Sequence, residues 1–150
     1  MVHHSLTFDG AVVDWQAIRN YHLGKGWSDI GYHFGIERIN GRPEILMGRS
    51  LEQRGAHCQE KNMNGLSWGV MLCGNFDLTP PDEGLLKELR RLCDGLMWVA
   101  PTITPAHVIG HREAGLLAGY DWRIKNDAGI PQFKSCPGLH LDMDAFRDSL

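Results

Sequence analysis

The 150-residue sequence lacks the features that mark several common classes of protein. Its four cysteines, Cys58, Cys73, Cys93 and Cys136, are far apart and form no C-x-x-C pair, so no local zinc knuckle or redox motif is expected. A chain of this length does not need a disulfide framework. Fifteen basic residues against 18 acidic ones give a net charge of -3, so no basic face for nucleic acid is expected.

Long apolar runs are also missing. No stretch approaches the roughly 20 residues that span a membrane, and the first residues lack the charged and apolar regions of a signal peptide. We therefore expect synthesis in the cytoplasm and no membrane insertion. The sequence contains no internal repeat, low-complexity tract or linker. Its length and its 43% hydrophobic content predict one domain over residues 1–150.

Alternating or continuous apolar residues predict five short strands. These strands span residues 2–7, 32–37, 44–47, 68–74 and 106–111. The dipeptide Asn40-Gly41 is a two-residue hairpin signal between the second and third of them. The run at 68–74 is almost entirely apolar, which is typical of a central strand covered on both faces.

Capping residues and apolar stripes predict three helices. Asp14 is positioned to cap a helix over residues 15–23, and the segment 79–82 opens a second helix with a cap and two prolines. The second helix carries a buried stripe of leucines. Its members are Leu85, Leu89, Leu92 and Leu96. A third, short helix begins at Asp142.

Two segments are predicted to be loops. Residues 55–65 are polar and contain glycine, which indicates a surface loop of the kind that often carries binding residues. Residues 112–133 are rich in glycine, aspartate and aromatics and show no clear periodicity. A loop as long as the second one is usually functional or disordered.

The run Lys134-Ser135-Cys136-Pro137-Gly138 joins a thiol and a cation at fixed spacing. In an extended segment Lys134 and Cys136 share a face, and Pro137 and Gly138 turn the chain away directly after the sulfur. This arrangement suits a metal ligand with a charged helper, although a free cysteine is also commonly a small buried hydrophobe. Together with two histidines at strand ends, the thiol would complete a His₂Cys zinc site with an open fourth position.

Short motifs follow one another along nearly the whole chain. They are Val2-His3-His4-Ser5, residues 26–34, Gly48-Arg49, Gly55-Ala56-His57, Asn64, residues 67–72, Gly110-His111 and Lys134-Ser135-Cys136-Pro137. In this order they resemble the zinc-dependent type 2 N-acetylmuramoyl-L-alanine amidases. That family includes phage endolysins and the peptidoglycan recognition proteins.

The resemblance implies an α/β fold, with a mixed central β-sheet flanked by helices, and a set of site residues. It places the ligands of one Zn²⁺ per chain on His3, His111 and Cys136, and an active-site tyrosine on Tyr32. Lys134 matches a lysine of the phage enzymes, which favours an active enzyme over a binding-only relative. The sequence departs from the family in having only Met1 and Val2 before His3. The choice of His3 over His4 therefore rests on the match and not on spacing.

The implied reaction is hydrolysis of the amide between N-acetylmuramic acid and the first L-alanine of the stem peptide, as in phage or prophage-type endolysins. Lys134 would stabilise the tetrahedral oxyanion, and Tyr32 would hydrogen-bond either the water or the oxyanion. Two alternatives are a cytoplasmic amidase that recycles soluble muropeptides and a noncatalytic peptidoglycan-binding module. Some phage relatives also bind an RNA polymerase, a role that this sequence neither supports nor excludes. An endolysin would act on the cell wall after release from the cytoplasm.

Four neighbouring residues have two interpretations each. His57 either lines the substrate groove or is a hydrogen-bonded loop histidine. Arg49 either meets a peptide carboxylate or forms a structural salt bridge. Asp29 and Glu113 either orient a ligand imidazole or form surface ion pairs, with ion pairing favoured for both. We interpret the remaining histidines as structural.

Overall fold

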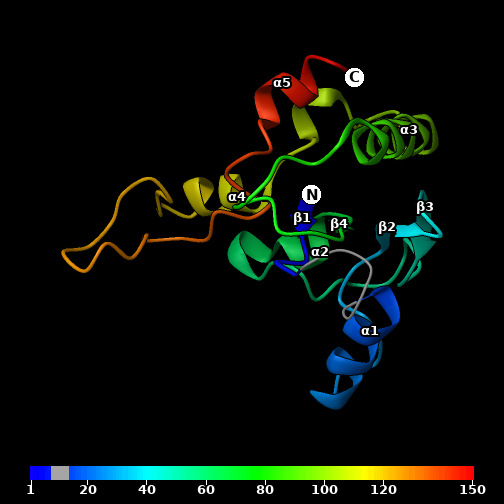
Figure 1. Ribbon diagram of the computed structural model, residues 1–150, viewed down its shortest axis with the longest axis horizontal. Coiled ribbons are helices and arrows are strands. Elements are labelled where there is room, and N and C mark those ends of the chain that lie inside the picture. The colour runs from blue at the N-terminus through cyan, green and yellow to red at the C-terminus, as the bar shows by residue number, and fades with distance from the viewer. Residues whose placement is uncertain (8–13) are drawn as a thin grey trace.

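The computed structural model describes residues 1–7 and 14–150, and a four-stranded sheet lies at its centre (Figure 1). The strands are β1 (Val2–His4), β2 (Phe34–Ile39), β3 (Arg42–Met47) and β4 (Val70–Leu72), in the spatial order β1-β4-β2-β3. β4 pairs in parallel with both β1 and β2, whereas β2 and β3 are antiparallel. The predicted mixed sheet is confirmed, and the apolar strand β4 takes an inner position as expected.

The hairpin between β2 and β3 turns at the predicted dipeptide. Asn40 and Gly41 have φ values of 52° and 79°. A type I′ turn requires positive φ at both central residues, and asparagine and glycine adopt this conformation at least cost.

Helices cover both faces of the sheet. On one face, α3 (Glu83–Val99) and α5 (Met143–Arg147) pack against alternate strand residues such as Val2, Val70 and Leu72. On the other face lies α1 (Trp15–Gly24), which Figure 1 shows on the opposite side of the strands from α3. The Trp15 ring fills the space over Gly35, where an added Cβ would lie 2.3 Å from the ring.

The predicted helices are confirmed, with one change of cap. Asp14 caps α1 by accepting a hydrogen bond from the main-chain N–H of Ala17 at 2.7 Å. The cap of α3 is Asp82, which follows the two prolines and accepts from Gly84 N–H at 2.8 Å. The leucine stripe of α3 is buried at Leu85, Leu89 and Leu92, as its spacing predicts.

The prediction of a strand over residues 106–111 is wrong. Pro105–His107 form a 3₁₀ helix, and extended pairing is limited to a single bridge between Gly110 and Val2. Helix α4 (His111–Leu117) then begins at once, because the Glu113 carboxylate accepts from Gly110 N–H at 2.6 Å and caps the first turn.

The two predicted loops are only partly loops. In segment 55–65, Gly55, His57 and Cys58 are buried, and a 3₁₀ turn (Glu60–Asn62) leads into α2 (Met63–Leu66). In the second predicted loop, residues 112–117 belong to α4. Residues 118–133 extend away from the sheet as the yellow-to-orange excursion of Figure 1. Within the described ranges, no helix is both long and apolar enough to cross a membrane.

Candidate metal centre

Two distant histidines meet because β1 and the start of α4 are joined by main-chain pairing. Val2 donates to the carbonyl of Ile109 at 2.8 Å, and Val2 and Gly110 form a parallel bridge. The next residue on each segment is a histidine, so His3 and His111 lie side by side, with ring centroids 4.7 Å apart.

Arg112 anchors the loop that carries Cys136. Its main-chain N–H donates to the carbonyl of Cys136 at 2.6 Å, and its buried guanidinium donates to the carbonyls of Gly138 at 2.5 Å and Leu141 at 2.7 Å. As a result Cys136 lies beside the two histidines, and its Sγ is 3.6 Å from His3 Nδ1.

The donor atoms of His3, His111 and Cys136 all lie within 4.8 Å of one another, and all three residues are buried. In the described residues, His111 Nε2 is a buried side-chain nitrogen without a hydrogen-bond partner. Two imidazoles and a thiol are a common zinc donor set, and three protein ligands leave a fourth position open. The residues therefore fit a zinc ion.

Burial keeps the three groups uncharged before metal binds. It lowers the pKa of His3 well below its usual value, and burial followed by the charge of Lys134 lowers that of His111 to about 4. Burial also raises the pKa of the Cys136 thiol to about 12. A metal ion therefore meets two neutral imidazoles, and the thiol must release its proton on binding.

A cavity of about 810 Å³ opens over these residues, and Tyr32 and Lys134 both line it. The Tyr32 ring lies 5.2 Å from that of His3, and burial raises the pKa of its phenol. Lys134 is exposed, and within the described chain it forms no ion pair. The cavity thus contains a neutral phenol and an ammonium that has no ion-pair partner among the described residues.

His57 also lines the cavity, but it is buried and bonded to a candidate ligand. Its Nδ1 lies 3.1 Å from His3 Nε2, and its Nε2 lies 3.2 Å from the carbonyl of Ser67. Burial lowers the pKa of His57 to about 3, so this imidazole is neutral at physiological pH. These contacts agree with the interpretation of His57 as a hydrogen-bonded loop histidine. Its contact with substrate stays a prediction.

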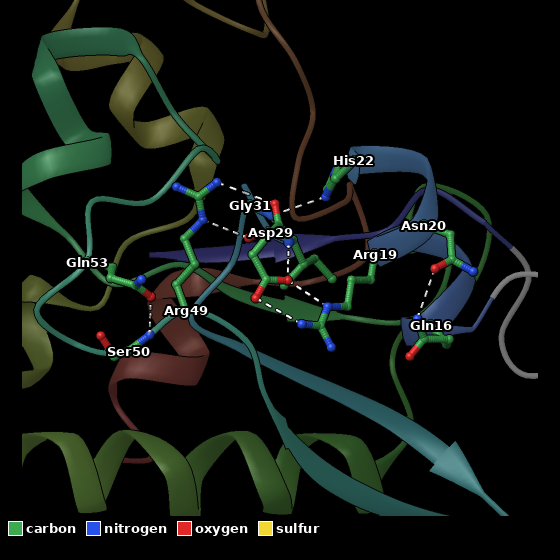
Figure 2. A network of polar contacts seen from close by, with 10 residues as sticks. Gln16, Arg19, Asn20, His22, Asp29, Gly31, Arg49, Ser50 and Gln53 are labelled. Carbon is green, nitrogen blue, oxygen red and sulfur yellow. Dashed lines mark hydrogen bonds and ion pairs between the residues drawn. The ribbon is translucent and has the colours of Figure 1, made fainter. Parts of the chain in front are cut away.

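Arg49 is not among the residues that line this cavity, and its side chain donates to main-chain carbonyls (Figure 2). Its guanidinium donates to the carbonyls of Ile30 at 2.8 Å, Arg54 at 2.5 Å and Asp29 at 3.4 Å. It lines a smaller pocket of about 290 Å³ with Asp29. Binding of a peptide carboxylate by Arg49 therefore stays a prediction.

The two acidic neighbours of the sequence prediction form ion pairs. Asp29 accepts from Arg19 at 2.6 Å, as Figure 2 shows, and Glu113 pairs with Arg147 at 2.9 Å. A different carboxylate lies at the candidate centre, because Glu60 Oε2 is 3.5 Å from His111 Nε2. No spacing in the sequence signals Glu60, because the 3₁₀ turn Glu60–Asn62 brings it to His111 from more than 50 residues away.

Asp77 is another residue that sequence reasoning missed. Its carboxylate accepts from Ser135 Oγ at 2.7 Å and from Leu139 N–H at 2.9 Å. It therefore holds the Cys136 loop together with Arg112, and an isolated aspartate in a turn gives no sign of such a role.

The geometry agrees with a comparison with known families. The family model described as N-acetylmuramoyl-L-alanine amidase matches residues 1–139. The chain belongs to this family. The endolysin of Escherichia phage T7 is 40% identical over 142 residues, which cover 93% of this chain and 80% of that endolysin.

More distant members of the amidase family have related sequences and folds. Peptidoglycan-recognition protein SC1a of Drosophila melanogaster is 25% identical over 84% of this chain, which spans 57% of that protein's length. The solved structure of wild-type Drosophila PGRP-LB has a TM-score of 0.64 at 25% identity and covers 91% of this chain and 72% of its own. The amidase LysC from Clostridium intestinale has a TM-score of 0.65 at 24% identity. The match covers 99% of this chain and 80% of LysC, and it supports the fold alone.

Proposed function

We propose that this member of the amidase family is a zinc-dependent hydrolase of endolysin type. Its reaction is cleavage of the amide between the lactyl group of N-acetylmuramic acid and the L-alanine of the stem peptide. The observation that carries the proposal is the convergence of His3, His111 and Cys136 beside a cavity lined by Tyr32 and Lys134.

His3, His111 and Cys136 are the residues that would hold the ion. A zinc ion bound there supplies a Lewis acid, which lowers the pKa of water and polarises a carbonyl group. The chain's own contribution is a buried donor set in which both imidazoles are already neutral. Neither imidazole has to lose an extra proton at neutral pH, so the Cys136 thiol is the ligand that must be deprotonated when zinc binds.

Lys134 and Tyr32 act on the substrate. When water attacks the scissile carbonyl, negative charge develops on its oxygen, and the ammonium of Lys134 stabilises that charge. The phenol of Tyr32 stays protonated because burial raises its pKa, so it donates a hydrogen bond to the attacking water or to the developing oxyanion. Both groups line the same cavity as the candidate ligands.

The cavity supports a substrate larger than a single amino acid. Its volume of about 810 Å³ lies within the usual range for ligand sites. The T7 relative is an endolysin, which favours cell wall over soluble muropeptides as the substrate.

Mass analysis of the products from purified cell wall tests this function. We expect glycan with a free lactyl carboxyl group and peptides with a new N-terminal alanine. Cleavage within the glycan or within the stem peptide would contradict the proposal, and binding without any new amine would indicate a noncatalytic module. The same assay on soluble muropeptides identifies a recycling amidase if those are cleaved and intact wall is not.

A further inference from the structure

We infer that His57 is a positioning residue that selects the metal-binding tautomer of His3. This inference deepens the proposed function and rests on it, because it concerns how the zinc ligand is prepared. It assigns His57 a role through His3 in place of direct contact with substrate.

A chain of three polar groups fixes the position of two protons. The carbonyl of Ser67 can only accept, so the contact at 3.2 Å requires the proton of neutral His57 to be on Nε2. Nδ1 of His57 then has a lone pair, and the contact at 3.1 Å requires His3 to donate from its own Nε2. His3 Nδ1 is left unprotonated, and this is the atom that lies 3.6 Å from Cys136 Sγ.

The His57 ring is held closely enough to enforce this arrangement. It is packed between two glycines, and a Cβ added at Gly55 or Gly69 would lie 2.4 Å or 2.5 Å from its Cδ2. Its main-chain N–H donates to the side-chain oxygen of Asn64 at 2.6 Å. The ring therefore cannot turn to offer an N–H to His3 without leaving its site.

The tautomer of His3 matters because only an unprotonated nitrogen can bind a metal ion. Without an acceptor near Nε2, buried His3 has no hydrogen bond that favours the tautomer protonated at Nε2. The tautomer protonated at Nδ1 then becomes more populated, and its Nδ1 cannot bind zinc until it loses that proton. Partners of this kind typically change metal affinity 10- to 100-fold.

Long-range ¹H–¹⁵N correlation NMR of the zinc-free protein tests the tautomer directly. We expect His3 to be protonated at Nε2 and His57 also at Nε2. A His3 ring protonated mainly at Nδ1 in the zinc-free wild type would overturn the inference.

Zinc affinity, measured by competition with a chromophoric chelator, tests the consequence. H57L removes the acceptor, and we expect zinc affinity to fall 10- to 100-fold. H57N places an amide oxygen where Nδ1 was, and we expect it to restore most of the affinity. An H57L variant that binds zinc as tightly as the wild type, or an H57N variant no better than H57L, would contradict the inference.

His33 provides a matched control for loss of stability. It is a buried histidine that accepts from Gly69 N–H at 3.0 Å and lies 2.9 Å from the carbonyl of Gln53. Its ring meets that of His57 edge-on at 5.8 Å, so H33L loosens the packing around His57 without removing the acceptor for His3. We expect H33L to lower the unfolding midpoint in urea while leaving zinc affinity within a few-fold of wild type. An equal loss of affinity in H33L and H57L would assign the effect to general loosening and overturn the inference.

Failure of this inference is distinguishable from failure of the proposed function. A wild-type protein that binds zinc, shows the expected tautomer and yet releases no alanine amine would end the amidase proposal and leave the role of His57 intact. An active amidase with the opposite His3 tautomer would do the reverse.

Discussion

Lys134 is the side chain whose removal best separates chemistry from structure. It is exposed and lies at the cavity, so its loss removes charge without opening the core. We expect K134A to keep its zinc and its unfolding midpoint and to lose about 100- to 1000-fold in turnover on purified wall, the usual effect of losing one oxyanion donor.

Lys125 offers the matched control for that variant. It is an exposed lysine of the same excursion and does not line the cavity. K125A should therefore retain wild-type turnover. Full activity in K134A, or an equal loss in both variants, would remove Lys134 from the mechanism.

The three candidate ligands could be proposed from motif matching, and the structure brings them together, but their environment could not be predicted. His3, His111 and Cys136 stand out because short motifs around each resemble one family. The partners of these residues are contacts between segments 50 or more residues apart, as with His57 and His3 or Glu60 and His111. Such pairs leave no periodicity in a single sequence, so only the structure identifies them.

The centre is assembled by three segments: β1, the first turn of α4, and the loop over residues 135–141. Arg112 connects the last two, because its guanidinium supplies donors to the carbonyls of Gly138 and Leu141. Without that cation these buried carbonyls would have to find other donors, and the position of Cys136 would be less well fixed.

We expect R112M, which keeps most of the side-chain volume, to lower the free energy of unfolding in urea. The cost is about 1–3 kcal/mol for each carbonyl left unsatisfied. We also expect weaker zinc binding in this variant. R91M is the control, since Arg91 is exposed and its surface pair with Glu88 is worth little. Stability and zinc affinity equal to wild type in R112M would show that the loop is held by other contacts.

Helices were more predictable than strands because their signals are local. The Asp14 cap and the leucine stripe of α3 lie within single segments and specify their helices directly. The apolar run Val108-Ile109 has the composition of a strand, but pairing depends on an available partner edge. Only Gly110 meets Val2 there, and the Glu113 cap starts α4 at the next residue.

For the molecule as a whole, the mixed sheet separates the core beneath α3 from the face that carries the candidate centre. Alternation along β1 directs Val2 into the core beneath α3 and directs His3 to the cavity. The candidate centre therefore lies at the β1 edge of the sheet, where α4 and the Cys136 loop can both reach it. Sequence patterns predicted the sheet and its helices, but the meeting of these three segments is a property of the tertiary fold.

Buried neutral histidines make the stability of the zinc-free protein depend on pH. Burial lowers the pKa values of His3, His57 and His111 in the folded chain, whereas in the unfolded chain they lie near 6.5. Above that pH these histidines are unprotonated in both the folded and the unfolded chain, and the free energy of unfolding has its full value. As the pH falls below about 6.5 the unfolded chain binds more protons, so the folded state loses stability until its own histidines titrate, near 4 and below.

Urea unfolding in the presence of a chelator measures this effect. We expect the free energy of unfolding to fall between pH 6.5 and 5, by at most about 1.4 kcal/mol per pH unit for each histidine. Most carboxylates stay ionised in this window, so histidines dominate the slope. H57N should show a shallower slope, since one titrating group is gone. A free energy that stays constant over this window would mean that these histidines are not buried in the neutral form.

The measurement that tests the central claim most directly is zinc K-edge X-ray absorption on the wild-type protein loaded with one equivalent of zinc. The convergence of His3, His111 and Cys136 predicts one sulfur at about 2.3 Å and two imidazole nitrogens at about 2.0–2.1 Å. The sulfur contribution should disappear in C136A. A wild-type spectrum without zinc–sulfur scattering would contradict the proposed centre.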